Sequence, residues 1–125
     1  MQRITVDSAG LETSVGRPAH NFAKAVGQVQ GLILDSHETR PLLKDHIEKA
    51  DLIVVMEYAH RYRLLKLFPH AKNKAFLLRQ FVNSHDLEIA DPYSGTMRDF
   101  EDCFDIIRQS CDSLVEEICR VRLNK

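Results

Sequence analysis

The run Leu52–Met56 constrains the fold of this chain more than any other segment. Its five residues are all apolar, three of them are β-branched, and no polar residue alternates with them. This pattern predicts a strand that is buried on both faces of a parallel sheet. Because parallel strands are joined by long crossover connections, usually helices, we expect the rest of the chain to alternate strands with helices.

The segments around this run fit such an alternation. Ile4–Val6 and Ala75–Leu78 predict two further strands. Apolar residues at helical spacing predict four helices, the first with Pro18 in its first turn and Gly31 at its end. These helices cover about residues 18–30, 42–50, 57–68 and 98–121. The order β-α-α-β-α-β-α predicts an α/β fold with an open parallel sheet flanked by helices in three layers, as a single domain over residues 1–125.

Composition and charge exclude several classes of function. The chain is 44% apolar and 28% charged, with a net charge of −1, so nothing attracts it to nucleic acid or to a membrane surface. No apolar run approaches the length of a bilayer span, and Met1–Gly10 does not resemble a secretory signal. A cytoplasmic location is therefore expected.

The three cysteines, Cys103, Cys111 and Cys119, all fall in the last predicted helix. They form no Cys-x-x-Cys pair, and no histidine stands beside them at the spacing of metal ligands. We expect reduced, buried cysteines, with no disulfide, metal or other cofactor.

Four short motifs occur in a specific order along the chain. They are Ser8-Ala9-Gly10 after a strand, Asp35–Arg40 before a helix, Asp51–Glu57 across the central strand, and Asp91-Pro92-Tyr93 before the last helix. In this order and spacing the sequence resembles the low-molecular-weight protein tyrosine phosphatase family. The resemblance implies a four-stranded parallel sheet flanked by helices. It also implies cysteine-dependent hydrolysis of protein tyrosine phosphate without a metal.

The resemblance also identifies what this sequence lacks. The family's nucleophile lies in a strand, Cys-x5-Arg loop and helix that precede the region matching Ile4–Gly10, and no such loop occurs here. We therefore expect an N-terminally truncated chain that is inactive by itself. The run from Cys103 to Arg108 has four intervening residues and lies within a predicted helix. Its amides would be bonded one turn back and could not bind phosphate, so we reject Cys103 as the nucleophile.

Five residues match functional positions of the family. The resemblance implies that Asp91 is the general acid, that Tyr93 and Glu57 lie on the substrate-binding rim, and that Ser8 and His37 support the phosphate-binding loop. A purely structural role is open for most of them. Asp91 can start a turn, Ser8 can end a strand, His37 can lie beside a helix cap, and Glu57 can be a helix-start acid.

Other polar residues have simpler expectations. Arg40 is expected to form a local salt bridge. The remaining histidines show no ligand spacing and are expected on the surface: His20, His46, His60, His70 and His85.

The substrate rim departs from the family pattern. Many relatives have a second tyrosine where this chain has Ser94, and the segment Leu11–Gly16, matching the opposite wall, has no aromatic residue. Both departures weaken stacking on a phosphotyrosine ring. The expected substrate is a phosphotyrosine protein or a small aryl phosphate.

Two classes of function remain open from the sequence. One is the C-terminal portion of a tyrosine phosphatase; the other is a non-catalytic binding or regulatory module on the same fold. Arsenate reduction on this fold is disfavoured because the cysteines lie far from the expected site.

The resemblance also bears on the stability of the chain. In the family, the strand that this sequence lacks lies between the strands matching Ile4–Val6 and Leu52–Met56. The chain alone is therefore expected to be unstable, rearranged, or a strand-exchanged homodimer.

Overall fold

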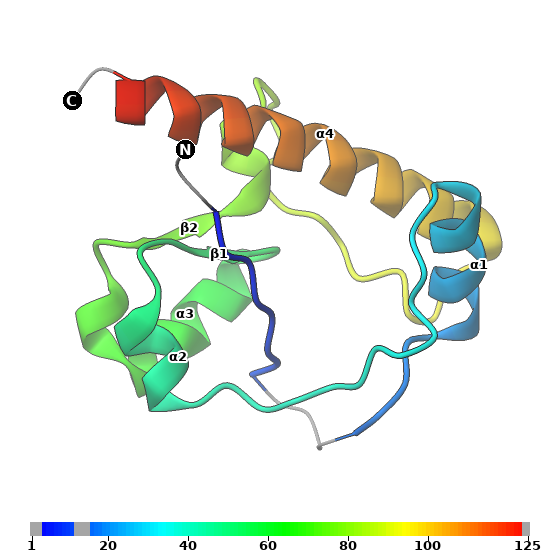
Figure 1. The fold of residues 1–125 in the computed structure, drawn as a ribbon, viewed down its shortest axis with the longest axis horizontal. Coiled ribbons are helices and arrows are strands. Elements are labelled where there is room, and N and C mark those ends of the chain that lie inside the picture. Colours follow the sequence, from blue (N-terminus) through cyan, green and yellow to red (C-terminus); the bar gives the residue numbers. More distant parts are fainter. Residues whose placement is uncertain (1–3, 12–15, 124–125) are drawn as a thin grey trace.

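The computed structural model of the chain describes residues 4–11 and 16–123, and the fold is an open parallel sheet flanked by helices. The sheet consists of β1 (Ile53–Val55) and β2 (Ala75–Leu77). Figure 1 shows helix α4 (Met97–Leu123) on one side of the sheet, and α2 (Lys44–Lys49) and α3 (Tyr58–Leu67) on the other. The predicted three-layer α/β class is therefore confirmed.

The two strands are parallel, as the apolar run predicted. Ile53 lies opposite Ala75 and Val55 opposite Leu77, and α3 forms the crossover between the strands. The N–H of Ile53 donates to the carbonyl of Lys74 at 2.8 Å. Because backbone groups alternate along a strand, Ile53 and Val55 direct their N–H and C=O groups toward β2. Val54 directs its own groups toward the opposite edge of β1.

The predicted first strand is not formed. Residues 4–9 belong to no strand, and the side chains of Ile4 and Val6 are 44% and 85% exposed. The described sheet therefore has two strands rather than three. A strand needs a neighbour for its backbone groups, and β1 is not paired with this segment. For the same reason, β1 is half-buried on average and not fully buried as predicted.

The main hydrophobic core lies between the sheet and helices α2 and α3. Leu64 of α3 is 1% exposed, and Ile53 and Val55 pack against the cluster to which it belongs. The fully buried members of this cluster are Ile47, Leu64, Ala71 and Ala75. Side chains at alternate positions of a strand point to opposite faces, so Val54 lies on the face turned away from this core.

The helix boundaries follow most of the sequence signals. Helix α1 (Asn21–Val29) begins after His20, so Pro18 lies before the helix and not in its first turn as predicted. Gly31 follows the helix with φ +83°, a conformation that glycine adopts freely, which confirms its predicted place at the helix end. Pro69 ends α3 and opens the 3-10 turn η1 (Pro69–Ala71). A second 3-10 turn, η2 (Leu78–Phe81), follows β2.

Helix α4 carries the three cysteines, and all of them are free thiols. Cys103 is half-buried, but Cys111 and Cys119 are exposed, so the prediction that they are buried is wrong. Each step of eight residues turns the side chain by about 80° around the helix axis, which moves the later cysteines off the packed face. Among the helices described, including α4, none combines the length and apolar character needed to cross a membrane.

Candidate functional site

The first two motifs lie side by side. The N–H of Gly10 donates to the carbonyl of Arg40, and the N–H of Leu42 donates to the carbonyl of Gly10, both at 2.8 Å. The Arg40 side chain forms an ion pair with Asp7 and donates from Nε to the carbonyl of Ser8 at 2.9 Å. Arg40 therefore forms a salt bridge as predicted, although with Asp7, 33 residues earlier, and not with a neighbour in sequence. These contacts join the segment 7–10 to the segment 38–42.

Ser8 and His37 are both exposed at this junction. The N–H of Ser8 donates to Asp7 Oδ1 at 2.9 Å, and the N–H of His37 donates to the carbonyl of Leu34 at 3.1 Å. Their side chains make no hydrogen bond to another described residue. Both side chains are thus open to a further partner, and their loop-supporting role stays a prediction.

Asp91 lies in an exposed turn directly before α4. Its Oδ1 accepts from the N–H of Tyr93 at 2.9 Å, and the N–H of Gly95 donates to the carbonyl of Pro92 at 2.7 Å. The turn leads into the N-terminus of α4, where Thr96 and Asp99 cap each other (N–H of Thr96 to Asp99 Oδ2, 2.8 Å). Asp91 does initiate a turn, and it is exposed to solvent, while its role as general acid stays a prediction.

Glu57 follows β1 at its carboxyl end, the edge at which open α/β sheets place ligands. It is half-buried, and its Oε1 lies 3.7 Å from His60 Nε2. Its side chain does not cap α3, because Glu88 Oε2 accepts from the N–H of Tyr58 at 2.9 Å. The N–H of Ile89 donates to the carbonyl of Met56 at 2.8 Å, which anchors the connection leading to Asp91 at the same edge of the sheet.

Cys103 has the opposite character to a catalytic thiolate. It lies inside α4, with Sγ 3.9 Å from the carbonyl oxygen of Ala90. Burial, and then the negative charge of Asp91, raise the pKa of the Cys103 thiol above the ordinary value. A nucleophilic cysteine needs a lowered pKa. The geometry supports the rejection of Cys103 as nucleophile, and it places Asp91 close to this thiol.

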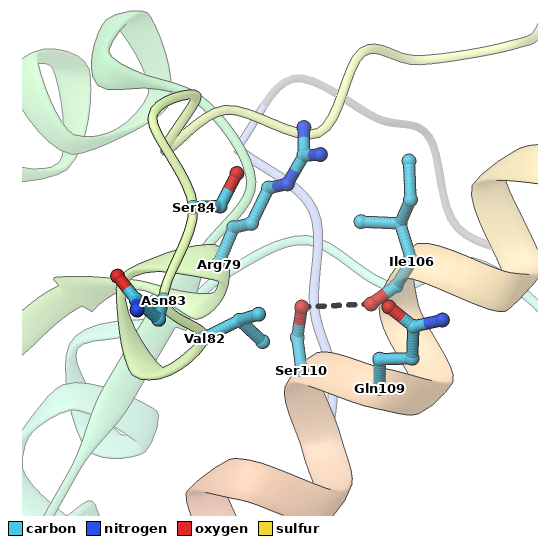
Figure 2. Close-up of a pocket in the computed structure, with 7 residues that line it drawn as sticks. All are labelled: Arg79, Val82, Asn83, Ser84, Ile106, Gln109 and Ser110. Carbon is cyan, nitrogen blue, oxygen red and sulfur yellow. Dashed lines mark hydrogen bonds between the residues drawn. The ribbon is translucent and has the colours of Figure 1, made fainter.

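A cavity of about 220 Å³ lies between the connection after β2 and helix α4 (Figure 2). Arg79 donates from Nη1 to the carbonyl of Glu88 at 3.0 Å and lies 3.3 Å from Asp86 Oδ2. Ser110, fully buried, donates to the carbonyl of Ile106 at 2.7 Å. The cavity is lined by Arg79, Val82, Asn83, Ser84, Ile106, Gln109 and Ser110. It is smaller than typical small-molecule sites and includes none of the predicted site residues.

Sequence reasoning missed His20, which it placed on the surface. The side chain is half-buried, and its ring contacts those of Phe22, Phe100 and Tyr93. No signal in the sequence indicated this, because the helix was predicted to begin at about residue 18, whereas in the structure it begins at Asn21 and His20 is its N-cap. The opposite wall of the predicted cleft falls partly on residues 12–15, which lie outside the described residues.

The described residues therefore place the exposed carboxylate of Asp91 next to the exposed ring of Tyr93, and the thiol near them, Cys103, has a raised pKa. No three His, Cys, Asp or Glu side chains among these residues gather closely enough to hold a metal ion. A carboxyl group beside an exposed ring is the combination that the predicted roles of general acid and substrate rim require. It cannot by itself attack phosphorus.

Comparison with known proteins identifies the family of this chain. A profile of low molecular weight phosphotyrosine protein phosphatases matches residues 1–123. The chain is 34% identical over 115 residues to a protein-arginine-phosphatase of Geobacillus stearothermophilus, covering 92% of this chain and 77% of that protein. The chain therefore belongs to the low molecular weight phosphotyrosine protein phosphatase family, as its motifs indicated.

Solved structures agree with this assignment. The YwlE arginine phosphatase from Geobacillus stearothermophilus superposes with a TM-score of 0.87 at 32% identity, covering 94% of this chain and 76% of that one. The tyrosine phosphatase AmsI of Erwinia amylovora superposes with a TM-score of 0.82 at 30% identity, covering 87% of this chain and 71% of that one. The two-stranded sheet and its helices are thus arranged as in this family.

Proposed function

We propose that these 125 residues supply the general acid and the substrate rim of a cysteine-dependent protein phosphatase, and that they are inactive without the family's Cys-x5-Arg loop. The observation that carries the proposal is the exposed Asp91 turn, which in this family context has an acid but no thiolate beside it. Ser8 and His37, exposed at the junction of two motifs, would support the lacking loop.

The proposed reaction has two steps. A thiolate from the Cys-x5-Arg loop attacks phosphorus, and the bond from phosphorus to the ester oxygen breaks while Asp91 protonates the leaving oxygen. Water then attacks the phosphorus of the phosphocysteine, with Asp91 as the base that accepts the proton. This step releases phosphate and regenerates the thiolate.

The edge of β1 that faces away from β2 supports the proposed position of the strand that precedes the Cys-x5-Arg loop. Val54 turns its N–H and C=O away from β2, and the described sheet provides no partner at that edge. A strand placed there would pair with β1, and the loop after it would reach the carboxyl end of the sheet near Glu57. Without such a segment, the same edge favours a strand-exchanged homodimer.

The test compares the 125-residue chain with a version extended at its N-terminus by the strand, Cys-x5-Arg loop and helix of a relative. We expect no hydrolysis of para-nitrophenyl phosphate by the chain alone and clear turnover by the extended version. Asp91→Asn should lower kcat of the extended version by about 10²–10⁴-fold. Cys103→Ser serves as the control and should leave it unchanged. Turnover by the chain alone that Cys103→Ser abolishes would refute the proposal. An extended version that folds and binds phosphate without turnover would favour the binding-module alternative.

The rim also bears on the substrate class. Tyr93 is followed by Ser94, and the segment Leu11–Gly16 has no aromatic residue, so little ring surface is available to stack on phosphotyrosine. We propose phosphoarginine as a second candidate substrate, because the relative named first is a protein-arginine-phosphatase. Peptides carrying phosphoarginine or phosphotyrosine, given to the extended version, distinguish the two by kcat/KM.

A further inference from the structure

His20 joins three parts of the molecule. As the N-cap of α1, it accepts a hydrogen bond at Nδ1 from the N–H of Phe22 at 3.0 Å. Its ring stacks on that of Phe100 in α4, with centroids 4.6 Å apart and planes at 28°. The ring of Tyr93, from the Asp91 turn, meets it edge to face at 5.4 Å and 77°. One side chain therefore contacts α1, α4 and the candidate acid loop.

The two rings that His20 joins differ in burial: Tyr93 is exposed and Phe100 is buried. The Tyr93 ring is 62% exposed, and among the described residues His20 is its single aromatic partner. Phe100, the ring on which His20 stacks, is 5% exposed and is also contacted edge to face by Phe22 at 5.6 Å. The buried Phe100 ring therefore packs against His20, and His20 in turn is the contact that orients the exposed Tyr93 ring.

From these contacts we infer that His20 is a positioning residue for the Asp91 turn, an inference that rests on the proposed function. The N–H of Tyr93 donates to Asp91 Oδ1 at 2.9 Å, so the carboxylate moves with the Tyr93 backbone. Holding the Tyr93 ring against His20 therefore restrains both the rim aromatic and the acid. The restraint is set by α1 and α4, which lie outside the turn.

A histidine suits this position because it combines two properties. Common N-cap residues provide a small acceptor and no ring, whereas phenylalanine provides a ring and no acceptor. In His20, Nδ1 accepts from the N–H of Phe22 while the ring stacks on Phe100. The two properties can consequently be separated by substitution.

The test uses His20→Asn, which keeps a cap acceptor and removes the ring, and His20→Phe, which keeps the ring and removes the acceptor. The readout is the set of aromatic signals of ¹³C-labelled tyrosine in the 125-residue chain, which has three tyrosines. Tyr93 is assigned with Tyr93→Phe, while Tyr58 and Tyr62 serve as internal references. Loss of neighbouring rings removes the ring-current shift of Tyr93 and increases the mobility of its ring.

We expect His20→Asn to move the Tyr93 signals to the random-coil position, and His20→Phe to restore them, with Tyr58 and Tyr62 unchanged in both. In the extended version, His20→Asn should lower kcat several-fold more than it raises KM, and His20→Phe should recover kcat. Tyr93 signals that stay in place in His20→Asn, or that shift equally in both variants, would overturn the inference. Because the tyrosine spectra need no turnover, they decide the role of His20 even if the extended version is inactive.

Discussion

The open edge of β1 can be tested by moving one proline along the strand. Val54 and Val55 are adjacent, both are half-buried valines of β1, and they differ in the edge to which their N–H groups point. Proline removes an N–H, so it is tolerated in a strand where that N–H faces no partner. Val54→Pro should therefore be mild in this chain, and Val55→Pro should be severe.

The expected loss in free energy of unfolding follows from the backbone hydrogen bonds between β1 and β2. Val55→Pro removes the N–H that faces β2 and leaves a carbonyl of β2 unpaired, which together cost about 2–4 kcal/mol. Val54→Pro removes no ladder bond within the described sheet, so we expect it to cost about 1 kcal/mol or less from backbone and packing changes. A difference of about 2 kcal/mol changes the unfolding equilibrium constant roughly thirty-fold.

Urea denaturation followed by circular dichroism measures both variants. With an m-value of about 2 kcal/mol/M, the two midpoints should differ by about 1 M. If the two variants lose the same free energy of unfolding at every protein concentration, the claim that the Val54 N–H has no strand partner is refuted. A Val54→Pro loss that grows with protein concentration would instead identify pairing between two copies. In the extended version, where a strand should occupy this edge, Val54→Pro should become as costly as Val55→Pro.

Three further predictions follow from the described contacts. Leu64→Ala leaves a cavity in the fully buried core beside the sheet and should lower the free energy of unfolding by about 2–5 kcal/mol, measured in urea. Asp91→Asn removes a charge that raises the pKa of Cys103, so iodoacetamide should alkylate Cys103 faster at pH 8. Cys111, whose pKa is raised by burial and by Asp112, serves as the unchanged control in the same mass spectra. Gly95→Ala places a methyl group against the carboxylate and Cβ of Asp99, which should displace this capping residue and lower stability by about 0.5–2 kcal/mol, whereas an unchanged urea midpoint would show that the turn adapts.

The sequence by itself determined the class of fold, the family and the positions of most elements. The apolar run at Leu52–Met56 predicted a parallel strand, and helical spacing located α3 and α4 closely, because these signals depend on neighbouring residues along the chain. The four motifs indicated the family before any contact was known. The lack of a Cys-x5-Arg loop is likewise a property of the sequence alone.

Tertiary structure decided whatever depends on a partner distant in sequence. Ile4–Val6 has the composition of a strand, but it forms none because its backbone groups find no neighbouring strand. Cys111 and Cys119 share a helix with Cys103 but have rotated off the packed face, and burial depends on which side the other helices cover. His20 looked like a surface residue, since its contacts with Phe100 and Tyr93 join positions far apart in the chain. Local pattern fixes the type of each element, whereas the pairing of elements determines which residues meet at a site.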